Sequence, residues 1–505
     1  MAAGCADPGL ILGAEPTSAT SVGSLDPTTV GSTGGSSGTD ESSGGLDDTG
    51  PVSPCIGPDG LDICNDKIDL LFVIDNSGTM GEEQLNLASN FPMLIEQLQT
   101  LENQRGEPVG ADVNIMVTTT DFDNPLCQGA WVHRDYEPAK GSPISSPCTQ
   151  RLSRFTGFGP DPLVIEEACL DVCDPAAPAA PADQFIHFDA DGNHNVVGGT
   201  PSDALACIGP QGIDGCGFEA PLESMLQALN PGACWNDPEA CTDPDWDWIT
   251  APFLRPGAVL AIALITDEAD CSVKDFTIME SETFMEVEPA VGGPMSSSAI
   301  CWNAGVICTD HDPRTGAYSG CTSANKGSAG DVGVADSDAV LQPLSRYTNL
   351  LAALGGQGRE VIMLGVLGVP EVTEHAKAPP HQPIAGGLEA LVYRTWRDPD
   401  VPSGGDILPD EWDQGVRAVN KEFEFGVGPG CTGYDPGSGT YTGQAIPPVR
   451  IREVCESLNT PDDPTTRGID ETRIRCCVES ICGDDFSPAI RCLTGLIQEA
   501  VTPVE

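Results

Sequence analysis

Residues 68 to 80 read IDLLFVIDNSGTM, and this stretch decides the expected fold. Its apolar run has the length of a strand that is buried on both faces, as in a parallel sheet. The glycines that follow allow a sharp turn into a helix. Asp75, Ser77 and Thr79 therefore share a loop at the carboxyl end of a strand, where open α/β sheets place their ligand sites. One carboxylate and two hydroxyls offer only oxygen donors, which suit a hard cation such as Mg²⁺ better than zinc or copper.

A second apolar run, AVLAIALITD from Ala258 to Asp267, also ends in a carboxylate. Together the two stretches resemble the metal-ion-dependent adhesion motif, Asp-x-Ser-x-Ser, of von Willebrand factor type A (VWA) domains, with Thr79 in place of the last Ser. In that family an Asp at the end of such a strand completes the site, often through water, and Asp267 is the match here. The resemblance implies that Asp75, Ser77, Thr79 and Asp267 bind Mg²⁺, with Mn²⁺ or Ca²⁺ as substitutes. For Asp75 alone, the competing interpretation is a helix cap in a strand-to-helix loop.

The loop that should supply a third ligand departs from the family. There the family has a Thr, whereas residues 215–222 read GCGFEAPL. Cys216 aligns nearest the missing Thr, and we expect it to pair with Cys207. Glu219 is the best substitute donor; alternatively, it only stabilises a helix N-terminus. A third carboxylate would favour a closed structural cation site over one open to an acidic partner. Asp270, a little further along, is expected on the solvated surface rather than behind the ligands.

Apolar strands alternate with amphipathic helices along the chain. Helices are predicted at 81–102, around 222–229, at 339–354 and at 487–501, and strands at 68–74, 111–121, 258–267 and 361–368. This alternation predicts an α/β fold, a doubly wound and mostly parallel sheet flanked by helices. The VWA-like frame would cover roughly 66–505. Three long insertions interrupt it, near 122–205, 271–338 and 371–450. Their Cys, Pro and Gly content suggests disulfide-stapled excursions that carry binding specificity.

Composition excludes several classes of function. The 505 residues are 40% hydrophobic, enough for a real core, but 76 acidic residues face only 23 basic ones, for a formal net charge of −53. Such a surface repels nucleic acid and anionic membranes. No run of about 18 apolar residues predicts a membrane-spanning helix. The sequence shows no His-Glu-x-x-His spacing and no convincing nucleophile or phosphate-loop motif. We therefore expect no enzyme; a hydrolase with its catalytic groups in the insertions is the weakest alternative.

The 21 cysteines argue for an oxidising compartment. Connectivity cannot be deduced from sequence, but the spacing suggests local pairs: Cys169/Cys173, Cys207/Cys216, Cys234/Cys241, Cys308/Cys321 and Cys482/Cys492. No paired Cys-x2-Cys clusters support zinc. Ala-Ala-Gly-Cys5 resembles the cleavage box of a bacterial lipoprotein, and lipidation of Cys5 would leave an even number of cysteines. No charged and apolar leader precedes it in this sequence, so either the true start lies upstream or the match is accidental.

Residues 1–54 otherwise read as a flexible, acidic Ser/Thr/Gly tether, followed by a folded part at 55–505. The sequence thus predicts a secreted or lipid-anchored protein of a bacterial cell envelope. It would bind a protein or other macromolecular partner through a VWA-type cation site and its surrounding loops. The alternative is a purely structural extracellular scaffold in which the cation site is closed.

Overall fold

The computed structural model describes residues 66–127, 137–157, 162–246, 249, 251–398, 415–435, 440–460 and 473–501. The predicted tether and Cys5 lie outside these residues.

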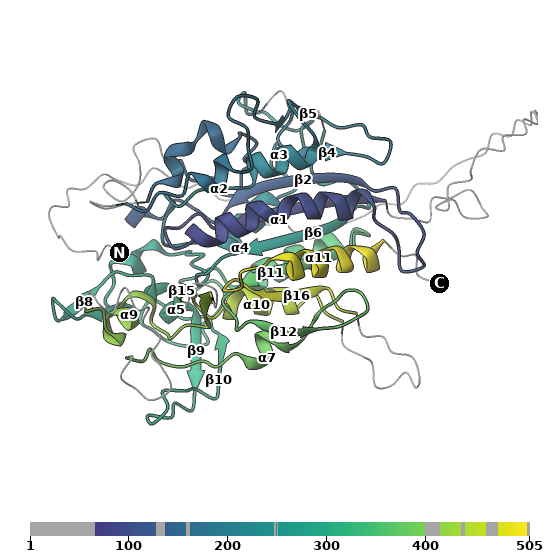
Figure 1. The fold of residues 1–505 in the computed structure, drawn as a ribbon. Coiled ribbons are helices and arrows are strands. Elements are labelled where there is room, and N and C mark those ends of the chain that lie inside the picture. The colour runs from purple at the N-terminus through teal and green to yellow at the C-terminus, as the bar shows by residue number, and fades with distance from the viewer. Residues whose placement is uncertain are drawn as a thin grey trace, which may run out of the picture.

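A six-stranded mixed sheet forms the centre of the molecule, in the order β16-β11-β6-β1-β2-β4 (Figure 1). Neighbouring strands from β16 to β2 run parallel, and β4 pairs with β2 antiparallel at one edge. The strands are β1 (Lys67–Ile74), β2 (Asp112–Thr119), β4 (Ile186–Phe188), β6 (Val259–Ile265), β11 (Val361–Leu367) and β16 (Cys476–Ser480). Every residue of β6 and β11 is buried, as expected of apolar strands that are covered on both faces.

Helices cover both faces of this sheet. One face packs on α1 (Gly81–Gln99), α3 (Pro201–Ile208) and α11 (Ser487–Ala500), and the opposite face packs on α4 (Pro221–Ala228), α6 (Leu344–Gly355) and α10 (Val449–Glu456). Alternate residues of β1 enter the two cores, Phe72 on one side and Leu71 on the other. The result is a mixed α/β fold. No described helix is long and apolar enough to cross a membrane.

Two strands of the sheet were not predicted. β4 lies within the first insertion, which therefore contributes an edge strand as well as loops. β16 reads CCVES, and its cysteines and glutamate give no apolar run. Helix α6 begins at Leu344 rather than near 339, because Pro343 has extended backbone and precedes its first turn.

The insertions contain short elements of their own. The first holds α2 (Glu167–Leu170), β3 (Ala180–Pro181) and β5 (Val196–Val197); the second holds β7 (Glu286–Glu288), β8 (Gly293–Met295), α5 (Ala299–Gly305), β9 (Val306–Thr309) and β10 (Gly320–Ser323); the third holds β12 (Val372–His375), β13 (Pro383–Gly386), α7 (Gly387–Ala390), α9 (Ala418–Phe425), β14 (Cys431–Asp435) and β15 (Thr440–Ala445). In Figure 1 the first insertion lies on the β4 side of the sheet, and most of the later two lies on the opposite side. Two small apolar clusters, separate from the main cores, hold the second and third insertions together.

Nine disulfides join described cysteines, which places the folded chain in an oxidising compartment. The predicted pairs Cys234–Cys241 and Cys308–Cys321 are confirmed. The other three predicted pairs are wrong; the observed partners are Cys148–Cys169, Cys173–Cys207, Cys127–Cys216, Cys431–Cys482 and Cys477–Cys492. Nearest-neighbour spacing fails here because segments far apart in sequence fold against one another, up to a separation of 89 residues.

Candidate metal centre

Two of the predicted ligands follow neighbouring parallel strands. Asp75 comes directly after β1, and Asp267 comes two residues after β6. In the register of the two strands Ile74 pairs with Ile265, and the amide of Asp75 donates to the carbonyl of Ile265 over 2.9 Å. The carboxyl ends of β1 and β6 therefore meet, and the two carboxylates lie close enough for Asp75 to raise the pKa of Asp267.

Asp75 is completely buried and held on both sides. Its Oδ1 accepts a hydrogen bond from the Ser77 amide at 2.8 Å, and its Oδ2 accepts one from the Thr266 hydroxyl at 2.5 Å. Burial raises the pKa of this carboxyl, and the two hydrogen bonds oppose that rise. The carboxylate is thus fixed in one orientation at the base of the loop.

The two hydroxyls that the sequence predicts as ligands lie beside each other. Ser77 Oγ and Thr79 Oγ1 are 3.2 Å apart, close enough for a hydrogen bond in either direction. Ser77 is buried, whereas Thr79 is exposed. The Thr79 hydroxyl also lowers the pKa of Asp267, which places it at that carboxylate. The cluster of Asp75, Ser77, Thr79 and Asp267 is therefore approached from solvent on the Thr79 side.

The negative charge of the Asp267 carboxylate is poorly compensated by its surroundings. Burial, and then the charge of Asp75, raise its pKa to about 8. Its Oδ1 is buried and has no hydrogen-bond partner among the described residues. Such an oxygen is costly to keep in the folded protein unless something binds it.

Glu219 joins the same cluster from the loop before α4. It is 1% exposed, and its Oε1 also lacks a hydrogen-bond partner in the described part of the chain. Burial, followed by the charges of Asp75 and Glu268, raises its pKa well above the ordinary value. Its loop is tied down by backbone hydrogen bonds of 2.8 Å from Ala220 to Thr120 and 2.7 Å from Cys271 to Glu219. Glu219 is thus an inward-facing carboxylate rather than a surface residue at a helix end.

Cys216 is unavailable as a ligand, although not for the predicted reason. It is bonded to Cys127, not to Cys207. Its amide donates to Oδ2 of Asp121 at 3.0 Å, and this buried Asp has its pKa raised to about 6, chiefly by burial. The disulfide therefore fastens the Glu219 loop to the segment that follows β2, and the hydrogen bond to Asp121 holds the same loop near the carboxyl end of that strand.

Three functional neighbours were missed by the sequence reasoning. Thr266 orients Asp75, and Asp121 ends β2 much as Asp75 ends β1; both follow apolar strands, which was the available signal. Glu268 is 7% exposed, and burial followed by the charge of Asp267 raises its pKa well above the ordinary value. The positive charge of Lys421 on α9 opposes that rise. Nothing in the sequence indicates that Lys421 and Glu268 lie near each other.

Asp270 is not on the solvated surface, so that expectation is wrong. It is 2% exposed, and its Oδ2 accepts a hydrogen bond from Arg450 Nε at 2.9 Å. Its Oδ1 accepts a hydrogen bond from the Ser272 hydroxyl at 2.6 Å. Because its charge is paired with Arg450, Asp270 belongs to the packing of α10 against the end of β6.

The donor set fits a hard divalent cation. Within the described ranges, no group of three or more His, Cys, Asp or Glu side chains could hold a metal by itself. A cation would therefore rely on the carboxylates of Asp75 and Asp267 together with the hydroxyls of Ser77 and Thr79, all of them oxygen donors. The unpartnered oxygens of Asp267 and Glu219 are the observation that favours such a fit.

Comparison with known proteins adds little. No protein-family model matches the sequence, and no curated protein matches it. Part of the chain is similar to the open conformation of the pilus adhesin SpaC from Lactobacillus rhamnosus GG, with 11% sequence identity and a TM-score of 0.22. The match covers 60% of this chain and 24% of the adhesin. A second crystal form gives 12% identity, a TM-score of 0.20 and coverage of 60% and 25%. The chain spans about a quarter of that adhesin, and likeness at this level carries no argument about fold or function.

Proposed function

We propose that the chain is a VWA-like, doubly wound module of a bacterial cell envelope that binds a macromolecular partner through a divalent cation. One observation carries the proposal. Asp75 and Asp267, at the ends of neighbouring parallel strands, lie together with Ser77 and Thr79, and Asp267 retains a buried oxygen without a partner. Mg²⁺ is the proposed resident ion, with Mn²⁺ and Ca²⁺ as alternatives.

The ion would supply a fixed positive charge and no bond would be broken. The chain's own residues do the rest: Thr266 and the Ser77 amide orient Asp75, and the buried position of Asp267 excludes water from one side of the site. Exposed Thr79 leaves an approach for a partner. Affinity would come mainly from the wider surface of the insertions, with the cation setting geometry.

Calorimetric titration of Mg²⁺ into the oxidised chain tests this proposal. Thr79→Ala should weaken binding by about tenfold or more, because it removes a hydroxyl ligand from the exposed side without opening the core. Ser89→Ala on α1 is the matched control, since that hydroxyl is exposed, donates to the Asn86 carbonyl and accepts a 3.4 Å hydrogen bond from the Asn90 side chain, away from the site. Saturable binding that Thr79→Ala does not weaken would remove this residue from the site, and absence of binding would refute the cation-dependent function.

A second candidate, a closed structural cation site, is favoured by Glu219. Its Oε1 is buried and unpartnered among the described residues, and its pKa responds to the charges of Asp75 and Asp267, so it would act as a third carboxylate ligand in place of a partner's. In that case Glu219→Gln weakens cation binding as strongly as Thr79→Ala does. An open site predicts instead that Glu219→Gln leaves cation affinity within about twofold of the parent or improves the binding of acidic partners, because one repulsive charge is gone.

The envelope location rests on the oxidised cysteines and on the lipoprotein-like start at Cys5. Metabolic labelling of cells with a palmitate analogue, comparing the parent with Cys5→Ser, tests the proposed anchor. Label that is lost with Cys5→Ser supports lipidation, and a parent chain without label excludes it.

A further inference from the structure

Among the described residues, no strand pairs with the outer edge of β16, which is the last strand on that side of the main sheet. On its inner side it bonds to β11: the amide of Met363 donates to the carbonyl of Arg475 at 2.8 Å, and the amide of Ile481 donates to the carbonyl of Leu367 at 2.9 Å. Alternate residues of a parallel strand direct their backbone groups to opposite sides. Cys476 and Val478 therefore direct their N–H and C=O groups away from the sheet.

Only some of the outward-facing backbone groups of β16 are hydrogen-bonded. The amide of Cys476 donates to Oδ1 of Asn459 at 3.1 Å, so a side chain occupies one strand position. The carbonyl of Cys476 and the amide of Val478 have no hydrogen-bond partner among the described residues. An acceptor and a donor in this relation are what one residue of an added extended strand satisfies.

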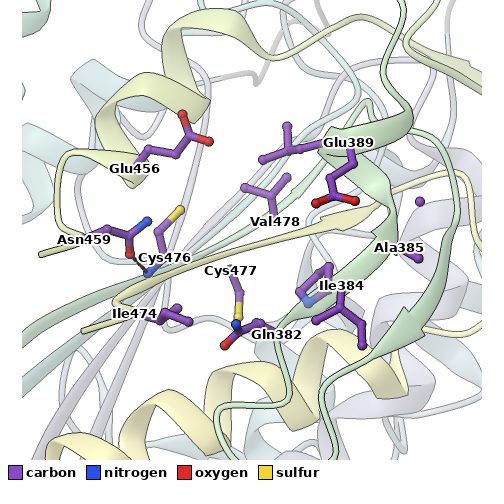
Figure 2. Close-up of a pocket in the computed structure, with 13 residues that line it drawn as sticks. Gln382, Ile384, Ala385, Glu389, Glu456, Asn459, Ile474, Cys476, Cys477 and Val478 are labelled. Carbon is purple, nitrogen blue, oxygen red and sulfur yellow. Dashed lines mark hydrogen bonds between the residues drawn. The ribbon is translucent and has the colours of Figure 1, made fainter. Parts of the chain in front are cut away.

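Both residues line a cavity of about 280 Å³ between β16 and the β13–α7 segment (Figure 2). Further on, the carbonyl of Val478 faces Gly387, where a β-carbon would lie 4.0 Å away. The β13–α7 segment therefore covers the later part of the edge. All residues of β16 are buried, but the cavity reaches Cys476 and Val478, which are 9% and 4% exposed, over a length suited to one or two residues.

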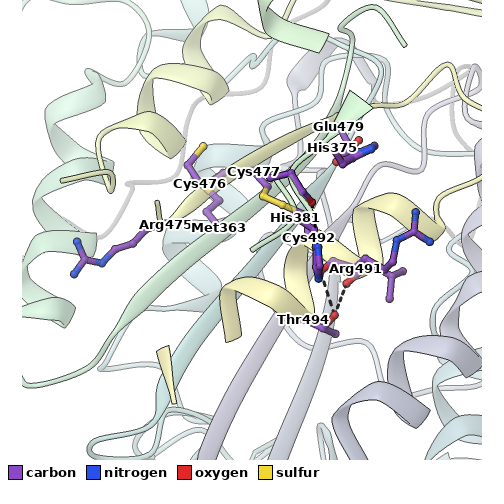
Figure 3. Close-up of a disulfide and its surroundings, with 12 residues drawn as sticks. Met363, His375, His381, Arg475, Cys476, Cys477, Glu479, Arg491, Cys492 and Thr494 are labelled. Carbon is purple, nitrogen blue, oxygen red and sulfur yellow. Dashed lines mark hydrogen bonds and ion pairs between the residues drawn. A yellow bond between two sulfur atoms is a disulfide. The ribbon is translucent and has the colours of Figure 1, made fainter. Parts of the chain in front are cut away.

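Disulfides hold this edge rigidly on both faces. Cys476 is bonded to Cys455 of α10, and the next residue, Cys477, is bonded to Cys492 of α11. Figure 3 shows the second bond joining β16 to the helix beneath it. An edge fixed in this way loses little conformational entropy when a ligand binds.

The rim of the cavity is acidic. Glu389 and Glu456 are exposed, and Figure 2 shows them on opposite sides of Val478. Among the described residues that line the cavity there is no Lys or Arg, and the other side chains are largely apolar, such as Ile384 and Leu388. One oxygen of Glu456 lies 3.4 Å from Nε of Arg452, a half-buried i,i+4 partner on α10, so Glu389 carries the less compensated charge of the two.

We propose that this cavity captures an extended, basic peptide segment of another protein by strand addition to β16. One residue of the segment would donate its N–H to the Cys476 carbonyl and accept from the Val478 amide. A neighbouring Lys or Arg would lie between Glu389 and Glu456, and its alkyl chain would contact Ile384 and Leu388. This site is independent of the candidate metal centre.

The probe is a fluorescein-labelled peptide, Ac-Val-Lys-Val-Lys-Val-NH2, titrated with the oxidised full chain and followed by anisotropy. We expect saturable binding that weakens with salt, and no binding of the peptide in which Glu replaces each Lys. Methylating the peptide's backbone nitrogens one at a time should give an alternating result. Positions that face Cys476 lose about tenfold in affinity, and their neighbours lose nothing.

Matched variants locate the site on the protein. Glu389→Gln with Glu456→Gln should weaken peptide binding about tenfold at low salt. Glu96→Gln with Glu239→Gln makes the same change in net charge at exposed positions elsewhere and should have no effect. Failure to bind, equal binding of the Glu peptide, or a methylation profile without alternation would each overturn the proposal.

Discussion

Replacing Asp267 with Asn should stabilise the cation-free protein at alkaline pH while it abolishes cation binding. The reason lies in the surroundings of this carboxylate: it is 4% exposed, one oxygen has no partner, and Asp75 repels its charge. Asn keeps the shape of the side chain but never carries the charge. The variant therefore separates the cost of the buried charge from its use in binding an ion.

The sign of the stability change follows from the pKa of Asp267 in the folded and in the unfolded chain. In the folded chain burial raises the pKa of Asp267 from 3.8 to about 8, whereas the unfolded chain loses the proton near the ordinary value. Stability provided by the protonated form is fully present below pH 3.8 and is lost as the pH rises to 8. That difference corresponds to an upper limit of roughly 6 kcal/mol. Relaxation and water penetration around the charge reduce the expected gain to about 2 kcal/mol.

Guanidinium unfolding in the presence of a chelator, at pH 4, 6 and 8, measures this effect. We expect Asp267→Asn and the parent to be equally stable at pH 4, and the variant to be increasingly more stable toward pH 8. Asp171→Asn, at an exposed position, is the control and should show no such trend. A stability difference that does not change with pH, or a variant that is less stable at pH 8, would refute the reasoning.

Three further predictions concern the folded chain. Arg255→Leu should lower the free energy of unfolding by about 3–5 kcal/mol in guanidinium titrations. The reason is that Asp69 is buried and its Oδ1 would lose the 2.7 Å ion pair that compensates its charge. A loss below about 1 kcal/mol would contradict this. Removing the disulfide with Cys127→Ser and Cys216→Ser should weaken Mn²⁺ binding in calorimetry several-fold, since it frees the Glu219 loop, whereas removing the disulfide of residues 234 and 241 should not. Saturating the parent with Mg²⁺ at 100 times its Kd should add about 2.7 kcal/mol to the unfolding free energy, and no shift would mean that the ion does not bind the native state preferentially.

Much of the sheet could be predicted because its inner strands are continuous apolar runs. β1, β6 and β11 are buried along their length, apart from the first residue of β1, and this burial requires the residue types that the sequence shows. β4 and β16 could not be predicted in the same way. They are edge strands of 3 and 5 residues, so fewer neighbours constrain their side chains.

The candidate site could be predicted only for residues that directly follow the apolar strands in the sequence. The resemblance to VWA domains predicted that Asp75 and Asp267 lie together, and the parallel pairing of β1 with β6 brings their carboxyl ends to one edge of the sheet. Whether a carboxylate is buried depends instead on distant segments. Asp270 becomes buried because Arg450, 180 residues later in the chain, pairs with it. Three of the five predicted disulfides are wrong for the same reason; Cys127 and Cys216, for example, meet only after the loops that follow β2 and precede α4 have packed.

The most direct test of the cation site is anomalous diffraction from crystals of the oxidised protein soaked in Mn²⁺. We expect a single strong peak within coordination distance of Asp75, Ser77, Thr79 and Asp267, or of waters that bridge these residues to the ion. We also expect the peak to disappear in Asp75→Ala crystals. A peak elsewhere, or no peak near these side chains at saturating Mn²⁺, would contradict the central claim.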